Sequence, residues 1–174
     1  SALRSLGGVL RRLGKLAEAR ASLEAALEME RAEGIRRNEV MCLEELGEVQ
    51  LDRGDNDAAV EALTEADAIC REVGHGQMHA EVLEALGRAH LARSDPGTAR
   101  TTLESGLKLA RQQGARDVQV RLHRGLADAC RDLGDHHLWI PGGVALDQRA
   151  VSRLDPAHRE ALLECESLRP TIVG

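Results

Sequence analysis

The sequence is almost without aromatic side chains: its 174 residues include one Trp and neither Tyr nor Phe. The buried core must therefore be assembled from Leu, Ala and Val. Long apolar runs are also missing, so we expect no membrane span and no secretory leader. The four cysteines have no CxxC spacing, which favours reduced thiols in a cytoplasmic protein. They are Cys42, Cys70, Cys130 and Cys165.

Charge and motifs exclude several classes of function. The formal net charge is −6, and the arginines are distributed among acidic residues, which argues against a nucleic-acid surface. There is no P-loop, no GxGxxG after a strand, no HExxH and no GxSxG, and strand signals are almost absent. Paired acids such as Glu44 and Glu45 are expected on a helix surface, with no apolar pocket to raise a pKa. We predict no enzyme activity and no cofactor.

One group of residues has an order that metal ligands can have. Cys70, His75 and His79 follow the pattern C-x4-H-x3-H at a loop between predicted helices. A structural zinc site, however, needs a fourth ligand and paired cysteines. We therefore expect solvated histidines and a half-buried thiol rather than a metal site. His136 and His137 are likewise expected to face solvent at a turn.

What the sequence does contain is a helical hairpin, clearest over residues 83–103. Apolar residues recur there at the three-and-four spacing of one helix face, and Gly87 lets a second helix approach closely. Asp95 and Pro96 then mark the start of that second helix, because Asp caps free N–H groups and Pro lacks the donor that would go unpaired. Ala99 is expected to face Gly87 between the two helices.

The hairpin recurs every forty residues without a slip. The Leu-Gly pair of its first helix recurs as Leu6-Gly7, Leu46-Gly47 and Leu86-Gly87, followed by Leu126-Ala127. The turn between the helices holds Gly14, Gly54, Ser94 and Gly134. The second helix keeps the same phase at Ala19, Ala59 and Ala99 and at Leu23, Leu63 and Leu103. Each unit closes with a basic residue in the last helical turn and a glycine just past it.

This order of small and large residues resembles the tetratricopeptide repeat (TPR), with Leu-x2-Leu-Gly, a turn Gly, and Ala and Leu four apart. The resemblance covers about residues 1–134, or three and a half units. The usual aromatic positions hold Leu, Gln50, His90 or Cys130, and the period is 40 where the family usually has roughly 34. A longer period is similar to members found in bacterial signalling regulators and kinesin light chains. The resemblance implies an all-α fold, an α-solenoid of antiparallel helical hairpins with an irregular C-terminal cap helix.

The chain can be divided into units by this register. We expect the first helix of each hairpin, the A helix, over about residues 2–13, 37–53, 77–93 and 117–133. The second, the B helix, is expected over about residues 16–32, 56–72 and 96–112. The units cover about residues 1–34, 35–74, 75–114 and 115–135. Because the chain begins without Met and in the middle of a pattern, we expect a fragment of a longer protein.

The fourth unit departs from the pattern. Trp139 stands where Ala is expected, and Pro141, Gly142 and Gly143 cannot continue a regular helix. We expect residues 136–168 to form a degenerate fourth unit, with a short helix over about 144–153 and a capping helix over about 156–168. Residues 169–174 are expected to be a tail.

In the family that the chain resembles, the concave wall is built from the A helices. Carrying those positions over implies a groove that is acidic in its middle and basic at both ends. The implied partner-binding residues are Arg4, Gly8, Arg11, Met41, Glu44, Glu48, Leu51, Glu81, Glu84, Arg88, Leu91, Arg121, Arg124, Asp128 and Arg131. The alternative is an ordinary solvated helix face, because a chain with 30% charged residues has some clustering anywhere.

Two functions remain open. The first is a non-enzymatic protein-interaction scaffold that holds a basic and apolar peptide, or a partner domain, in this groove. The second is a sensory or regulatory segment of a larger bacterial regulator, whose output domain is a nucleotide cyclase or a DNA-binding module. The Lys/Asn clamp that related chaperone adaptors use for a carboxylate tail is absent, which disfavours that class of partner. Self-association through apolar solenoid ends is a further expectation.

Overall fold

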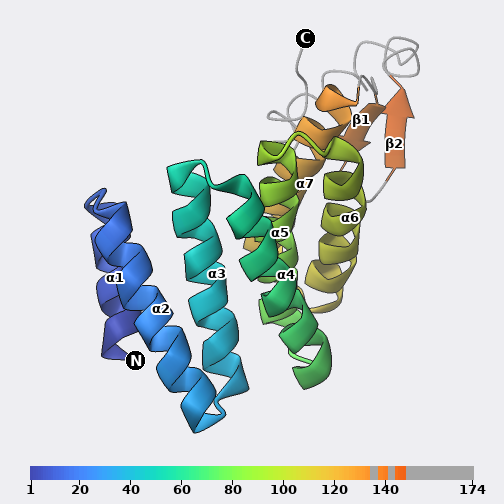
Figure 1. The fold of residues 1–174 in the computed structure, drawn as a ribbon. Helices are drawn as coiled ribbons and strands as arrows, with labels where there is room; N and C mark the ends of the chain where they lie inside the picture. The colour runs from blue at the N-terminus through green and yellow to red at the C-terminus, as the bar shows by residue number, and fades with distance from the viewer. Residues whose placement is uncertain (134–136, 141–143, 148–174) are drawn as a thin grey trace.

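The computed structural model describes residues 1–133, 137–140 and 144–147, which form seven helices and two short strands. Figure 1 shows the helices as hairpins set side by side in chain order, from the blue N-terminus to the orange end. The helices are α1 (Ala2–Arg12), α2 (Leu16–Glu33), α3 (Arg36–Arg53), α4 (Asn56–Val73), α5 (Gly76–Ala92), α6 (Pro96–Gln112) and α7 (Arg116–Asp132). The A helices are thus α1, α3, α5 and α7, and the B helices are α2, α4 and α6.

Each of the seven A and B helices predicted from the repeat is confirmed, with bounds within one residue of the expected ones. The turn positions set these bounds: Gly54 has φ 79°, and Ser94 takes the same left-handed conformation at φ 62°. Asp95 caps α6 by accepting a hydrogen bond from the Thr98 backbone N–H at 3.1 Å. Asp55, at the equivalent position before α4, makes no side-chain capping bond. Turn geometry rather than capping therefore keeps the repeat in register.

The Leu-Gly pairs of α1, α3 and α5 are points of close approach to the B helix that follows each of them. A Cβ added at Gly47 would lie 2.6 Å from Leu63 Cγ, and one added at Gly87 would overlap the side chain of Leu103. The sequence predicted that Ala99 faces Gly87, but the nearest neighbour of Gly87 is Leu103. Ala99 is nevertheless fully buried. Glycine leaves a notch in the A helix, and the leucine of the B helix fills it.

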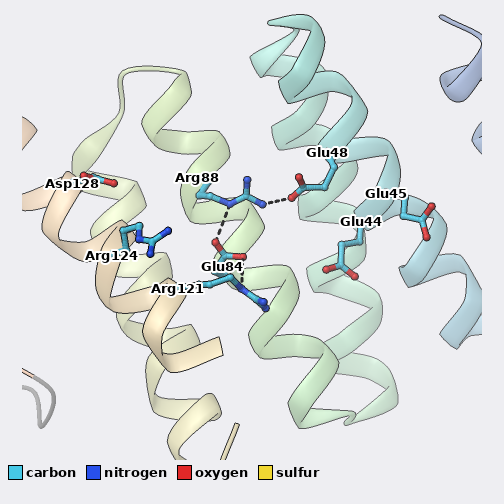
Figure 2. Close-up of a pocket in the computed structure, with 9 residues that line it drawn as sticks. Glu44, Glu45, Glu48, Glu84, Arg88, Arg121, Arg124 and Asp128 are labelled. Atoms are coloured by element: carbon cyan, nitrogen blue, oxygen red, sulfur yellow. Dashed lines mark hydrogen bonds and ion pairs between the residues drawn. The ribbon is translucent and has the colours of Figure 1, made fainter. Parts of the chain in front are cut away.

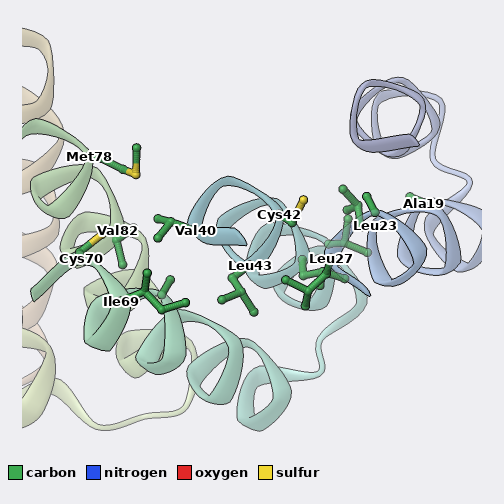
Figure 3. Close-up of a cluster of buried hydrophobic side chains, with 14 of the residues drawn as sticks. Ala19, Leu23, Leu27, Val40, Cys42, Leu43, Ile69, Cys70, Met78 and Val82 are labelled. Carbon is green, nitrogen blue, oxygen red and sulfur yellow. The ribbon is translucent and has the colours of Figure 1, made fainter. Parts of the chain in front are cut away.

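The core follows the array of hairpins instead of forming one central ball. Figure 3 shows its first cluster, in which side chains of α2, α3, α4 and α5 meet, among them Leu23, Leu43, Ile69 and Val82. Two further clusters continue the buried layer through α4 to α7. The buried apolar residues described are Leu, Ala, Val, Ile, Met and Cys, as the scarcity of aromatic residues predicted.

A β-hairpin follows the helical array. Strand β1 (His137–Ile140) pairs antiparallel with β2 (Val144–Asp147), and Ile140 lies opposite Val144. The short helix expected over 144–153 is therefore wrong at its start. The β-branched Ile140 and Val144 flank a Pro-Gly-Gly sequence, a combination that favours a hairpin over a helix. The remainder of that segment, the expected capping helix over 156–168 and the tail lie outside the described residues.

Candidate functional site

A groove of about 600 Å³ lies along the A helices α3, α5 and α7. The repeat explains its lining, because a period of forty residues places equivalent positions side by side on successive A helices. One row contains Glu44, Glu84 and Arg124, and the next row contains Glu48, Arg88 and Asp128. The rows are four residues apart, which is about one helical turn on the same face. Figure 2 shows these side chains pointing into the space between the helices.

The structure brings together half of the residues implied by the resemblance. Those that line the groove are Glu44, Glu48, Glu84, Arg88, Arg121, Arg124 and Asp128. Those on the same helices but outside its lining are Met41, Leu51, Glu81, Leu91 and Arg131, while Arg4, Gly8 and Arg11 lie on α1. Glu45 and Gly125 also line the groove and were missed. The repeat could have indicated both, because Glu45 and Gly125 are eighty residues apart and so occupy equivalent positions on α3 and α7.

Arg88 is the centre of the groove. Its Nε donates to Glu84 Oε1 at 2.9 Å, and its Nη2 donates to Glu48 on the neighbouring helix α3. Arg121 Nε lies 3.5 Å from the other oxygen of Glu84, whose side chain is only 8% exposed. A buried carboxylate needs such partners, because an unpaired charge there costs several kcal/mol (about 3–5). The acidic middle of the groove is thus largely paired with arginines.

Helix α1 adds two further pairs at the edge of this surface. Arg4 Nη1 donates to Glu45 Oε1 at 2.5 Å. Arg11 donates from Nε to Asp52 Oδ2 at 2.6 Å and from Nη2 to Glu48 Oε2 at 2.9 Å. These interactions raise the pKa of Arg11, the hydrogen bond to Asp52 having the largest effect. Arg4 and Arg11 of the first A helix are therefore paired with acids of α3.

Two charged side chains of the groove differ from the rest. Within the part of the chain that the structure describes, neither Glu44 nor Arg124 has a hydrogen bond or an ion pair. Burial and, next, the nearby carboxylates of Glu81, Glu48, Glu45 and Glu84 together raise the pKa of Glu44 to about 7. The expectation that no pocket perturbs Glu44 is therefore wrong. Figure 2 shows Glu44 on α3 and Arg124 on α7, with α5 between them.

Cys70, His75 and His79, the residues of the metal-like pattern, have different environments in the fold. His79 Nε2 lies 2.6 Å from Asp67 Oδ1, so this nitrogen has a carboxylate partner. Cys70 is buried, and burial raises the pKa of its thiol to about 12, which opposes the thiolate that a metal needs. His75 is exposed at the N-cap of α5. Among the residues described, no three His, Cys, Asp or Glu side chains are grouped as metal ligands.

Fold and groove together define a helical-repeat solenoid with a charged concave wall. A family model described as tetratricopeptide repeat matches residues 1–72 and 39–112, and the chain belongs to this family. No curated protein matches the chain. Repeats of this family generally mediate protein–protein interaction. None of the helices described combines the length and the apolar composition needed to cross a bilayer.

Proposed function

We propose that this protein is a non-enzymatic scaffold that holds a segment of a partner protein in the groove between α3, α5 and α7. The observation that carries the proposal is the pair of unpartnered opposite charges, Glu44 and Arg124, in a groove whose other charges are mostly paired. Paired charges gain little from a ligand, whereas a partly buried carboxylate gains an ion pair when a cation arrives. A partner segment with a basic and an acidic side chain can form ion pairs with Glu44 and Arg124 at the same time.

The spacing of the helices sets the spacing of charges in the partner. Packed helices have axes about 8–10 Å apart, so two steps from α3 through α5 to α7 cover roughly 16–20 Å. An extended chain advances about 3.3 Å per residue, and roughly five or six residues therefore cover that distance. Glu44 and Arg124 occupy the same register position. The partner segment that fits best has a basic and an acidic residue about five positions apart.

A charge-reversal experiment tests the proposal. The probe is a fluorescent peptide of Ala and Gln with one Lys and one Glu five positions apart, measured by anisotropy at low salt. We expect Glu44→Lys or Arg124→Glu to weaken its binding about tenfold, and the double variant to prefer the peptide with Lys and Glu exchanged. Glu61→Lys is the matched control, because Glu61 is exposed on α4 and lies outside the groove. Affinity unchanged in both groove variants would refute the proposal.

The pKa of Glu44 gives a second readout of the same complex. A partner cation favours the carboxylate form, so its binding at Glu44 releases a proton near neutral pH. We expect the affinity of the wild-type protein to rise as the pH rises through about 7, and Glu44→Gln to lose this dependence. Isothermal titration in buffers of different ionisation enthalpy measures the proton directly. Proton release that is the same in Glu44→Gln would assign it to another group.

A further inference from the structure

A second groove, of about 530 Å³, lies between the B helices α4 and α6, with α5 as its floor. Leu83 and Leu86 of α5 and Leu109 of α6 give the lining apolar side chains, among mostly polar residues of α4 and α6. Arg71 on α4 and Lys108 on α6 add cationic groups. This groove uses residues different from those of the concave site and was not part of the surface that the sequence implied.

The repeat shows what this groove lacks. One unit earlier, Arg31 Nη2 on α2 donates to Glu65 Oε1 on α4 at 2.5 Å, so an ion pair joins the two B helices. Forty residues further on, Arg71 keeps the cation, but Ser105 replaces the acid. The helices repeat, and so does the arginine, but the glutamate that pairs with it does not. The position beside Arg71 that a carboxylate of α6 would fill is therefore left to a short hydroxyl side chain.

A second ion pair of the preceding unit, between α3 and α4, also has no equivalent here. Arg36 Nη2 at the start of α3 donates to Glu72 Oε2 on α4 at 2.6 Å. The equivalent positions in the next unit hold Gly76 and Gln112. In addition, Lys108 stands at the register position of Ala68 on α4. At the positions compared, two carboxylates and one guanidinium of the preceding unit are lost, and one ammonium group is gained.

The remaining charges leave the groove positive. Among the described residues that line it, Asp67 has the one carboxylate, which is 8% exposed and pairs with His79 Nε2 at 2.6 Å and with Arg71 Nη2 at 2.5 Å. Arg71 is nevertheless 68% exposed, so several of its N–H groups stay accessible. Lys108 is exposed and has no ion pair with any other residue that the structure describes. The groove is thus a cationic patch on a chain of formal net charge −6.

We propose that the groove between α4 and α6 docks an acidic and apolar segment of a partner protein. A carboxylate of that segment takes the place beside Arg71 that Glu65 has beside Arg31, and an apolar side chain packs against the half-buried Leu109, beside the buried Leu83 and Leu86. Charge complementarity selects this occupant over a basic one, and the leucine side chains of the lining select a peptide over a simple anion. The chain then has two docking surfaces of different chemistry.

The proposal can be tested by introducing at Ser105 the glutamate that the preceding unit has at the equivalent position. Ser105→Glu places a carboxylate where Glu65 stands in the preceding unit, and Ser105→Gln is its uncharged control of the same size. Ser105 is exposed, and its only hydrogen bond among the described residues goes to the Thr101 carbonyl oxygen, so both variants should fold. Helical circular dichroism and urea unfolding check this before binding is measured.

The probe is a fluorescent dodecapeptide of Leu, Glu and Ala, and its affinity is measured by anisotropy. We expect saturable binding to the wild-type protein and to Ser105→Gln, and affinity at least about tenfold weaker for Ser105→Glu and for Arg71→Ala. The same peptide with Gln in place of Glu should bind weakly to every variant. Equal affinity for Ser105→Glu and Ser105→Gln would overturn the proposal, as would the absence of saturable binding. Binding that is lost in Arg124→Glu but kept in Ser105→Glu would place the peptide in the concave groove and overturn the second site.

Discussion

Neutralising Glu44 should stabilise the protein at neutral and basic pH. Its carboxylate is partly buried, lacks a partner among the residues described and stands near four other acids, and these causes raise its pKa from 4.5 to about 7. Below pH 4.5 the group is protonated in the folded and the unfolded chain, so it costs nothing there. Between pH 4.5 and about 7 the folded chain retains a proton that the unfolded chain releases, and stability falls as the pH rises.

The size of the effect follows from the shift. Each pKa unit corresponds to about 1.4 kcal/mol, and residual contact with water reduces the total, so we expect Glu44→Gln to gain about 2–3 kcal/mol at pH 8. The gain should nearly vanish at about pH 4, where both states are neutral. Urea unfolding followed by helical circular dichroism measures the difference, with exposed Glu61→Gln as the control. A gain of the same size at both pH values would refute this account of Glu44.

Two further pairs of substitutions, each with a buried and an exposed position, test the packing of the hairpins. Gly87→Ala should lower the free energy of unfolding by about 1–3 kcal/mol, because its methyl group overlaps Leu103. In contrast, Gly97→Ala, whose Cβ would meet nothing closer than 3.9 Å, should be neutral or stabilising. Ala99→Leu should also cost about 1–3 kcal/mol at a fully buried position, whereas Thr101→Leu on the exposed face should be nearly neutral. Equal losses within either pair, measured by urea unfolding, would mean that the register is wrong.

The helices could be predicted closely because their signals are local and periodic. A left-handed turn position, at Gly54 for example, fixes where one helix stops, and a forty-residue period then checks every assignment against its neighbours. Contacts between helices were harder. Ala99 and Leu103 are four residues apart on one face of α6, and only the depth at which α5 and α6 cross decides which of them enters the notch at Gly87.

Seven of the fifteen implied residues line the groove, but the state of its charges could not be predicted. Arginine side chains are long enough to reach the next helix, so Arg88 pairs with Glu48 as well as with its own-helix neighbour Glu84. Helical periodicity in the sequence does not indicate which residue of a neighbouring helix a long side chain will contact. The raised pKa of Glu44 likewise depends on burial between α3 and α5 and on acids from both helices. The identity of the partner, and a link to a larger signalling protein, stay predictions.

Both proposed docking surfaces depend on differences between equivalent positions of the repeat. The backbone units repeat, so a residue that departs from its counterparts forty residues away is not required by the hairpin. Arg124 departs from Glu44 and Glu84 in this sense, and Ser105 departs from Glu65. The first departure adds a cation without an ion-pair partner among the described residues to the groove between α3, α5 and α7, and the second removes an ion pair between B helices. Substitutions toward the consensus of the repeat should therefore leave the fold intact and remove binding, which separates the function of each groove from the stability of the array.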